Sequence, residues 1–226
     1  QSDNLTLVLE SIDIRGTSNG AINAVGHSLH LHLIDRVTIN VTNRGYVESI
    51  ANESDKTGYS TIKADSLRIT NTTNGTASTI TGGKGGTTDT HGKTGGIAID
   101  VQNTVIIQDA SHIKITGGNG GEGNIGKNGS SAVSASTDKD GEHGEAGING
   151  SNGGNGGVAI HCSTLQILNS KDITIVGGNG GNGGRGGDGG NGGNGGKGHR
   201  SRWGDAGGGG RGGGGGGRRG PGLFPG

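Results

Sequence analysis

Residues 177–198 repeat a triplet of two glycines and one variable residue, and this repeat limits the fold more than any other feature. A polyproline-II-type helix has three residues per turn, so the two glycines of each triplet form two bare edges. Such a helix satisfies none of its own backbone hydrogen-bonding groups and needs neighbouring helices as partners. We expect a bundle of polyglycine-II helices. The alternative is a disordered tail, because glycine loses the most entropy on ordering.

The composition argues against a conventional globular core. Of 226 residues 57 are glycine, and only 26% are hydrophobic and 2% aromatic, so order has to come from backbone hydrogen bonds and narrow aliphatic stacks. The formal net charge is zero, and no global field attracts a nucleic acid or a membrane. We expect no nucleic-acid partner and no membrane insertion. With one cysteine, Cys162, no disulfide can form within the chain.

A second pattern occurs five times along the chain. Each copy has an alternating run of aliphatic residues, a short polar corner and a second alternating run, and four copies are preceded by a third short run. The copies are 5–16, 29–40, 67–83, 105–118 and 165–178, and the preceding runs are 21–24, 61–64, 97–100 and 158–161. Alternation with period two predicts strands. We predict an all-β fold: a short parallel β-solenoid of about five coils with three strands each.

The insertions between copies all enter at the same corner, which is typical of a solenoid. The later insertions are richer in glycine than the first, and the third is the longest. The sequence thus divides into a solenoid domain, 1–176, with inserted arms 41–58, 82–94 and 117–156, followed by a glycine-rich tail, 177–226. Stacked coils lie about 4.8 Å apart, so the arms would emerge close enough to bond to one another.

Neither end of the predicted solenoid has a recognisable cap, although soluble solenoids normally need one. Head-to-tail contact between two such ends does not close on itself and gives a filament. The aliphatic residues expected at the two ends, and an apolar C-terminal plug, are therefore candidate assembly residues. They are Leu5, Leu7, Ile12 and Ile14 at one end, Leu165, Ile167, Ile173 and Ile175 at the other, and Leu223 and Phe224 in the plug.

Seven Asn-x-Ser/Thr sequons are candidate N-glycosylation sites in a secreted eukaryotic protein. They are Asn4, Asn40, Asn52, Asn71, Asn74, Asn128 and Asn149. The chain begins at Gln1 without a methionine, as a mature product does after removal of a signal peptide. We expect a secreted protein that is extracellular or on the cell surface.

Residues that could carry chemistry are sparse. The aspartates are scattered rather than clustered as acid–base catalysis requires, and His30 and His32 supply two ligands where a metal site needs more. We expect no catalytic residues, no metal site and no cofactor. Between Arg185 and Arg219 the tail has an excess of arginine but a single aromatic residue, Trp203, whereas RNA-binding segments interleave aromatics. Its expected partners are an acidic arm of a neighbour or anionic glycans.

The glycine stretches, mainly 177–198 and in part 117–123, resemble the polyglycine-II bundles of springtail antifreeze proteins and of tailed-phage receptor-binding adhesins. The first resemblance implies ice binding, although those proteins pair cysteines and this chain cannot. The second implies recognition of a receptor by loops between glycine helices. The aliphatic repeats resemble right-handed parallel β-helix proteins in general.

The leading hypothesis is a structural subunit of an extracellular filament or surface appendage, with itself as principal partner. One alternative is a non-enzymatic adhesin whose arms bind a cell-surface receptor. Another is an ice-binding protein, with Thr70, Thr81 and Thr116 on one flat face. A carbohydrate-active β-helix enzyme would instead require a carboxylate cluster on one face.

Overall fold

The computed structural model describes residues 4–16, 20–41, 57–87, 91–134 and 142–194. In these ranges the chain is all-β, with no helix. The strands are β1 (Asn4–Glu10), β2 (Asp13–Gly16), β3 (Ile22–Ile34), β4 (Thr38–Val41), β5 (Ile62–Thr72), β6 (Ser78–Thr81), β7 (Ile99–Val101), β8 (Thr104–Gln108), β9 (Ser111–Thr116), β10 (Ile160–His161), β11 (Thr164–Leu168) and β12 (Lys171–Val176).

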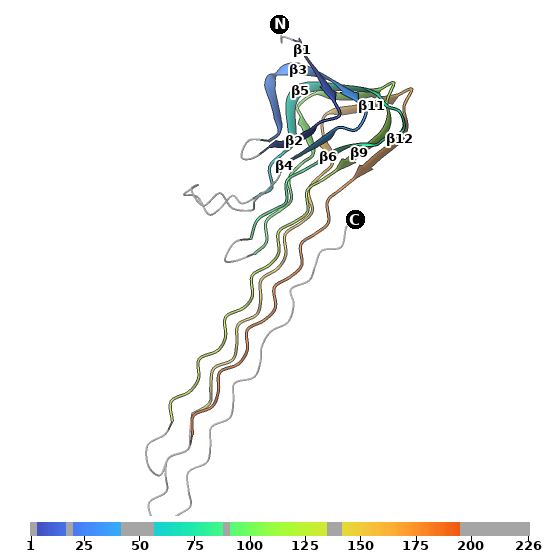
Figure 1. Cartoon of the computed structure of the whole chain (residues 1–226). Helices are drawn as coiled ribbons and strands as arrows, with labels where there is room; N and C mark the ends of the chain where they lie inside the picture. The colour runs from blue at the N-terminus through green and yellow to red at the C-terminus, as the bar shows by residue number, and fades with distance from the viewer. Residues whose placement is uncertain (1–3, 17–19, 42–56, 88–90, 135–141, 195–226) are drawn as a thin grey trace, which may run out of the picture.

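The strands form two parallel sheets, which confirms the predicted parallel all-β class (Figure 1). The seven-stranded sheet runs β1-β3-β5-β7-β10, with β8 also paired to β5 and β11 to β8. The five-stranded sheet runs β2-β4-β6-β9-β12. Each strand pairs with the equivalent strand of the next sequence repeat. In each repeat the chain crosses from the seven-stranded sheet to the five-stranded sheet and then returns.

The register confirms how the sequence repeats align. Leu5 pairs with Leu29, Leu29 with Leu67, Leu67 with Val105, and Val105 with Leu165. These steps of 24, 38, 38 and 60 residues are the spacings of the sequence repeats. Equal aliphatic positions therefore lie directly above one another, whatever the length of the insertion between them.

The expectation of three strands in every repeat is wrong for the early repeats. The runs predicted separately at 21–24 and from Leu29 belong to one bent strand, β3, and the same holds for β5. The bend lies at Gly26, where φ is 84° and the pairing of β3 with β5 shifts register between Ala24 and Ser28. Glycine adopts this φ without strain, so the chain turns without ending the strand.

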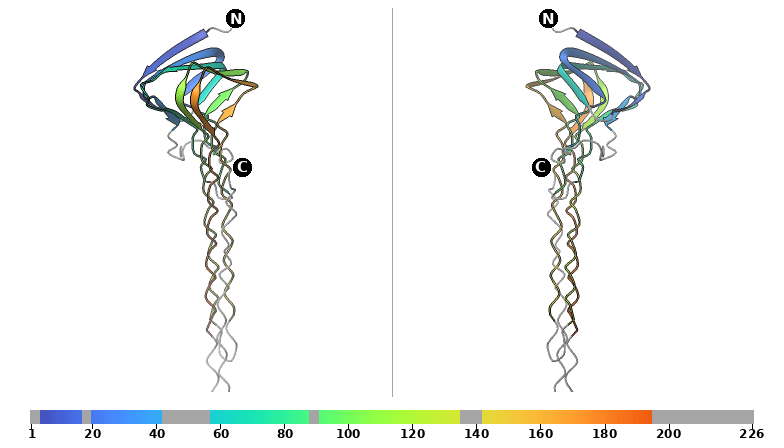
Figure 2. Two further views of the ribbon diagram at one scale, coloured as in Figure 1. Left: turned by 90° about the vertical axis from the view of Figure 1, so that its right-hand side faces the viewer. Right: turned by 90° about the vertical axis from the view of Figure 1, so that its left-hand side faces the viewer.

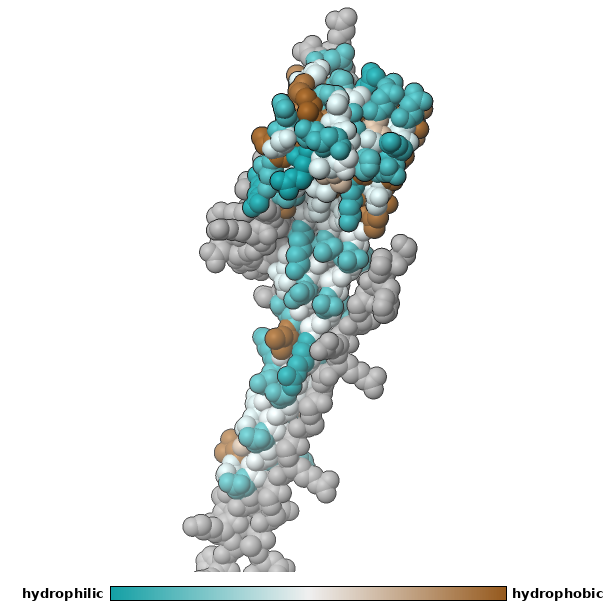
Figure 3. Space-filling view, turned by 45° about the vertical axis from the view of Figure 1, so that its right-hand side comes forward, coloured by the Kyte–Doolittle hydropathy of each residue, from teal (hydrophilic) through white to brown (hydrophobic). Residues whose placement is uncertain are grey.

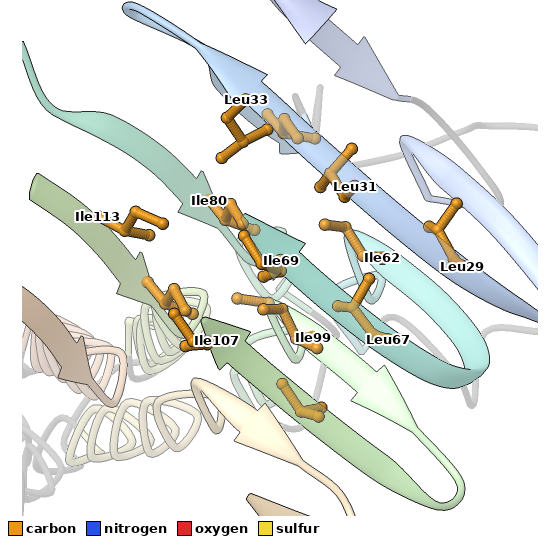
Figure 4. Close-up of a cluster of buried hydrophobic side chains, with 14 of the residues drawn as sticks. Leu29, Leu31, Leu33, Ile62, Leu67, Ile69, Ile80, Ile99, Ile107 and Ile113 are labelled. Carbon is orange, nitrogen blue, oxygen red and sulfur yellow. The ribbon is translucent and has the colours of Figure 1, made fainter. Parts of the chain in front are cut away.

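The core is a column of aliphatic side chains enclosed between the two sheets (Figure 4). Alternate residues of each strand point inward, as period-two alternation requires. The largest fully buried side chains are Leu31, Leu33, Val37, Ile39, Ile62, Leu67, Ile69, Ile80, Ile99, Ile107, Ile113 and Ile115. Full burial of each contributes roughly 1.5–3 kcal/mol, so the column is the main source of stability.

Polar residues shape the corner between the two sheets. Asp35, Asp109 and Asn169 have positive φ values of 56°, 49° and 48°, a conformation that Asp and Asn tolerate better than most residues. The buried side chain of Asn71 bonds both backbone groups of Ser111, donating to the carbonyl at 2.7 Å and accepting from the N–H at 2.8 Å. The corner therefore pairs backbone groups that no strand partner reaches.

Three extended segments run side by side away from the sheets and form a rod (Figures 1 and 2). They are the first rod segment (117–134), the second (142–157) and the third (177–194). Every third N–H of the first donates to the third, of the third to the second, and of the second to the first, at N–O distances of 2.7–2.9 Å. The backbone groups thus find partners on neighbouring segments, as the triplet repeat predicts.

The hydrogen bonds explain where glycine is needed. In the third rod segment the donor positions are glycines, and a Cβ at Gly184 or Gly187 would overlap a carbonyl oxygen of the first rod segment. Near the sheets, the short arm (82–87 and 91–96) packs beside the first and second rod segments. There a Cβ at Gly121 would overlap the Gly86 carbonyl oxygen, and one at Gly154 that of Lys93. Glycine is required at each position where a Cβ would point at the backbone of a neighbouring segment.

Candidate assembly interface

The first end of the strand stack is formed by β1 and β2, which pair on one side only among the described strands. Their core-facing side chains are incompletely covered. Leu5 is 42% exposed and Ile12 43% exposed, while Leu7 and Ile14 are partly buried against the core. This end therefore presents an apolar surface bordered by unpaired strand edges.

The second end, formed by β11 and β12, has the same character. Leu165, Ile167 and Ile175 are 41%, 45% and 36% exposed, and Ile173 is partly buried. The residues paired with these leucines and isoleucines one repeat earlier, such as Val105 and Ile107, are fully buried. Leu165 and Ile167 point inward as Val105 and Ile107 do, so they are exposed because no further strand covers them at the end of the stack.

The structure adds two residues that the sequence analysis missed. Val8 and Leu168 point outward and are 56% and 43% exposed. They occupy one column of the seven-stranded sheet, in which the intervening residues are polar: His32, Thr70 and Gln108. Comparison of outward positions across the five repeats would have shown this pattern, because only the two terminal repeats carry aliphatic residues there.

The remaining sequence candidates lie in varied surroundings. Leu223, Phe224 and Asn52 fall outside the described residues. Among the other sequons, Asn71 is buried with its side-chain nitrogen bonded to Ser111, so the folded chain offers no acceptor there. Asn40 is half-buried, and the exposed asparagines are Asn4, Asn74, Asn128 and Asn149.

The threonines considered for ice binding do not share a face. Thr81 and Thr116 are paired neighbours in the five-stranded sheet, whereas Thr70 lies on β5 of the other sheet. The expectation of one flat face containing all three is wrong, because Thr70 belongs to the strand before the corner and the other two to the strand after it.

A polar cluster lies on the outer face of the seven-stranded sheet. His30 Nε2 and His32 Nδ1 lie 3.0 and 2.8 Å from the Thr70 hydroxyl oxygen. Burial, the Arg68 charge and the neighbouring His32 lower the pKa of His30 below its ordinary value of 6.5. No three His, Cys, Asp or Glu side chains gather closely enough to hold a metal ion in the described ranges.

Exposed aliphatic side chains also occur singly along the rod (Figure 3). Ile125, Val133 and Ile148 are 73%, 77% and 61% exposed. They lie between polar residues and form no continuous apolar surface comparable to the two ends of the stack.

Comparison with known proteins gives no match to a family model, to a curated protein or to a solved structure. Within the part of the chain that the structure describes, no helix is suited to crossing a bilayer. Any functional assignment therefore rests on the chain's own surfaces.

Proposed function

We propose that this protein is a structural subunit of an extracellular filament or surface appendage, assembled head to tail through the ends of a parallel β-solenoid. The two sheets would be the faces of about five stacked coils, and the rod a polyglycine-II bundle that projects from them. The observation that supports assembly most strongly is that both terminal repeats expose aliphatic residues at positions that are buried or polar in the middle repeats.

The two ends are geometrically compatible. All strands of the stack run parallel, so β11 of one copy can pair with β1 of the next without a change of direction. Extension of the register brings Leu165 beside Leu5, Ile167 beside Leu7 and Leu168 beside Val8. Because one end meets a different end, the contact repeats without closing and gives a fibre.

The expected energy of this contact is moderate. Seven side chains that are 36–56% exposed would be covered, which contributes roughly 5–9 kcal/mol if full burial of each contributes about 1.5–3 kcal/mol. Association costs about 4–15 kcal/mol in lost freedom of motion. The strand ladder across the junction must therefore add to the apolar contact, and assembly should depend strongly on protein concentration.

The proposal extends to compartment and partners. The exposed sequons Asn74, Asn128 and Asn149 support a secreted glycoprotein, with glycans placed away from both ends of the stack. The principal partner would be the protein itself. Anionic glycans are the proposed partner of the arginines in the tail, of which Arg185 lies in the described part. The proposal assigns no catalytic residue and no cofactor.

A second candidate is a non-enzymatic adhesin, favoured by the exposed aliphatic residues on the projecting rod. Ile125 and Ile148 are more exposed than any large aliphatic side chain at the ends of the stack, and an elongated arm would present them far from the sheets. In this case the rod, rather than the ends, would make the functional contact.

Negative-stain microscopy and sedimentation of the purified protein, with two matched variants, distinguish the candidates. Leu168→Asp introduces a charge at the proposed junction, whereas Ile148→Asp introduces the same charge on the rod, at an exposed aliphatic position away from the junction. We expect filaments for the wild type and for Ile148→Asp, and monomers for Leu168→Asp. A wild type that stays monomeric at high concentration contradicts the proposal, as does a Leu168→Asp variant that still polymerises. Loss of receptor or cell binding in Ile148→Asp alone would support the adhesin.

A further inference from the structure

A hollow of about 500 Å³ lies over the outer face of the seven-stranded sheet, away from the aliphatic core. It is lined by side chains from β1, β3, β5 and β8. One row of small polar residues borders it, and a second row beside the first consists of Thr6, His30, Arg68 and the apolar Ile106. The residues of the first row are Asn4, Ser28, Ser66 and Thr104.

The first row follows the stack of strands. Asn4 pairs with Ser28 and Ser28 with Ser66, and Thr104 precedes Val105, the partner of Leu67. Three steps between strands of about 4.8 Å each give a row roughly 14 Å long. Hydroxyl and amide groups both donate and accept hydrogen bonds, so the row offers regularly spaced partners of either kind.

The hollow has a positive charge. Arg68 donates one hydrogen bond, from Nη2 to Gln108 Oε1 at 3.0 Å, and that partner is neutral. No ion pair in the described ranges includes Arg68. The nearest acidic residue in sequence, Asp65, is occupied elsewhere, because its carboxylate accepts the N–H of Gly26 at 2.8 Å. Arg68 therefore retains donors and charge for an anion.

We propose that this hollow binds a short acidic saccharide, with a sugar carboxylate or sulfate on the Arg68 guanidinium and ring hydroxyls along the Ser28–Ser66–Thr104 row. Arginine recognises such anions through paired, charge-assisted hydrogen bonds. A peptide strand would fit less well, because the backbone groups of β3 and β5 are used in the sheet and leave none for pairing. The proposal does not rest on filament assembly, since the hollow lies on a side of the sheet.

Titration calorimetry on the full chain tests this proposal with three probes. Trigalacturonate carries carboxylates, a heparin-derived tetrasaccharide carries sulfates as well, and maltotriose is neutral. We expect at least one acidic probe to bind and maltotriose to bind at least tenfold more weakly. Binding of trigalacturonate would show that carboxylates suffice, and binding of the heparin fragment alone that sulfate is required.

Two variants and one control locate the site. Arg68→Gln should weaken the binding of the acidic probe at least tenfold, and Thr104→Val, which keeps the side-chain shape, about threefold. Arg15→Gln is the matched control, because Arg15 is an exposed arginine on the five-stranded sheet, paired with Asp13. The proposal is overturned if neither acidic probe binds at millimolar concentration, if maltotriose binds equally well, or if Arg15→Gln weakens binding as much as Arg68→Gln.

Discussion

Gly184 offers a direct test of how closely the rod segments approach. Its N–H donates to the Ser151 carbonyl oxygen at 2.8 Å. A Cβ at this position would overlap the carbonyl oxygen of Asn124. Because that neighbour is backbone and cannot rotate away, Gly184→Ala forces the third rod segment away from the first.

The expected cost follows from the bonds around the substitution. Separation of the segments weakens the Gly184–Ser151 bond and the bonds donated by Gly123 and Gly126 to the third rod segment. Three hydrogen bonds at about 0.5–1.5 kcal/mol each give roughly 2–4 kcal/mol. Alanine lowers the entropy of the unfolded chain, which offsets about 0.4–1 kcal/mol. The variant should therefore open the rod locally, by roughly 1–4 kcal/mol.

Amide hydrogen exchange measures this effect residue by residue. In Gly184→Ala we expect amide exchange at positions 181, 184 and 187 to accelerate about tenfold or more, while amides of the two sheets keep their protection. Asn182→Ala is the control, because Asn182 is exposed and takes part through its backbone carbonyl. Unchanged protection in Gly184→Ala would refute the close packing of the rod, and equal loss in Asn182→Ala would refute the specific role of glycine.

Three further substitutions test the core, the corner and one titrating group. Ile107→Ala should lower the free energy of unfolding of the monomer by about 2–5 kcal/mol, and Ile167→Ala by clearly less, because Ile167 is 45% exposed; equal losses in chemical denaturation would contradict the end assignment. Asn71→Ala should cost about 2–4 kcal/mol in the same assay, since two buried backbone groups lose their partner. His30 has a lowered pKa, so the unfolded chain binds its proton first, and stability should fall as the pH drops below about 6.5. His30→Gln should remove that slope, and an unchanged pH profile would show that other groups cause it.

The sequence predicted which residues face the core and which aliphatic positions of successive repeats pair with one another. Alternating aliphatic residues specify which face of a strand is buried, so the pairing of Leu5, Leu29 and Leu67 followed from alignment of the repeats. The continuous strand β3 did not, because a glycine between two runs usually indicates a turn, whereas here Gly26 bends the strand without ending it.

Contacts of outward-facing and polar side chains between repeats were harder to predict. The outward pair Val8 and Leu168 becomes visible only when outward positions are compared along a column. The bond from Arg68 to Gln108 joins residues 40 positions apart, and their proximity depends on the register of β5 with β8. Asn71 was misleading for a related reason: its sequon suggests exposure, while its side chain bonds the backbone of Ser111, at the start of β9.

The positions of glycine in the first two rod segments also match the length of the short arm that packs beside them. In the first rod segment, Gly121 is in the last triplet that has two glycines. In the second rod segment, Gly154 is in the first such triplet. Both residues face the far end of the short arm. Beyond that point Asn124 and Ser151 take these places. The reach of one arm can thus be counted from the glycines of another. The third rod segment keeps two glycines in every triplet. By the same reasoning, a further backbone could pack against its second glycine edge along its whole described length.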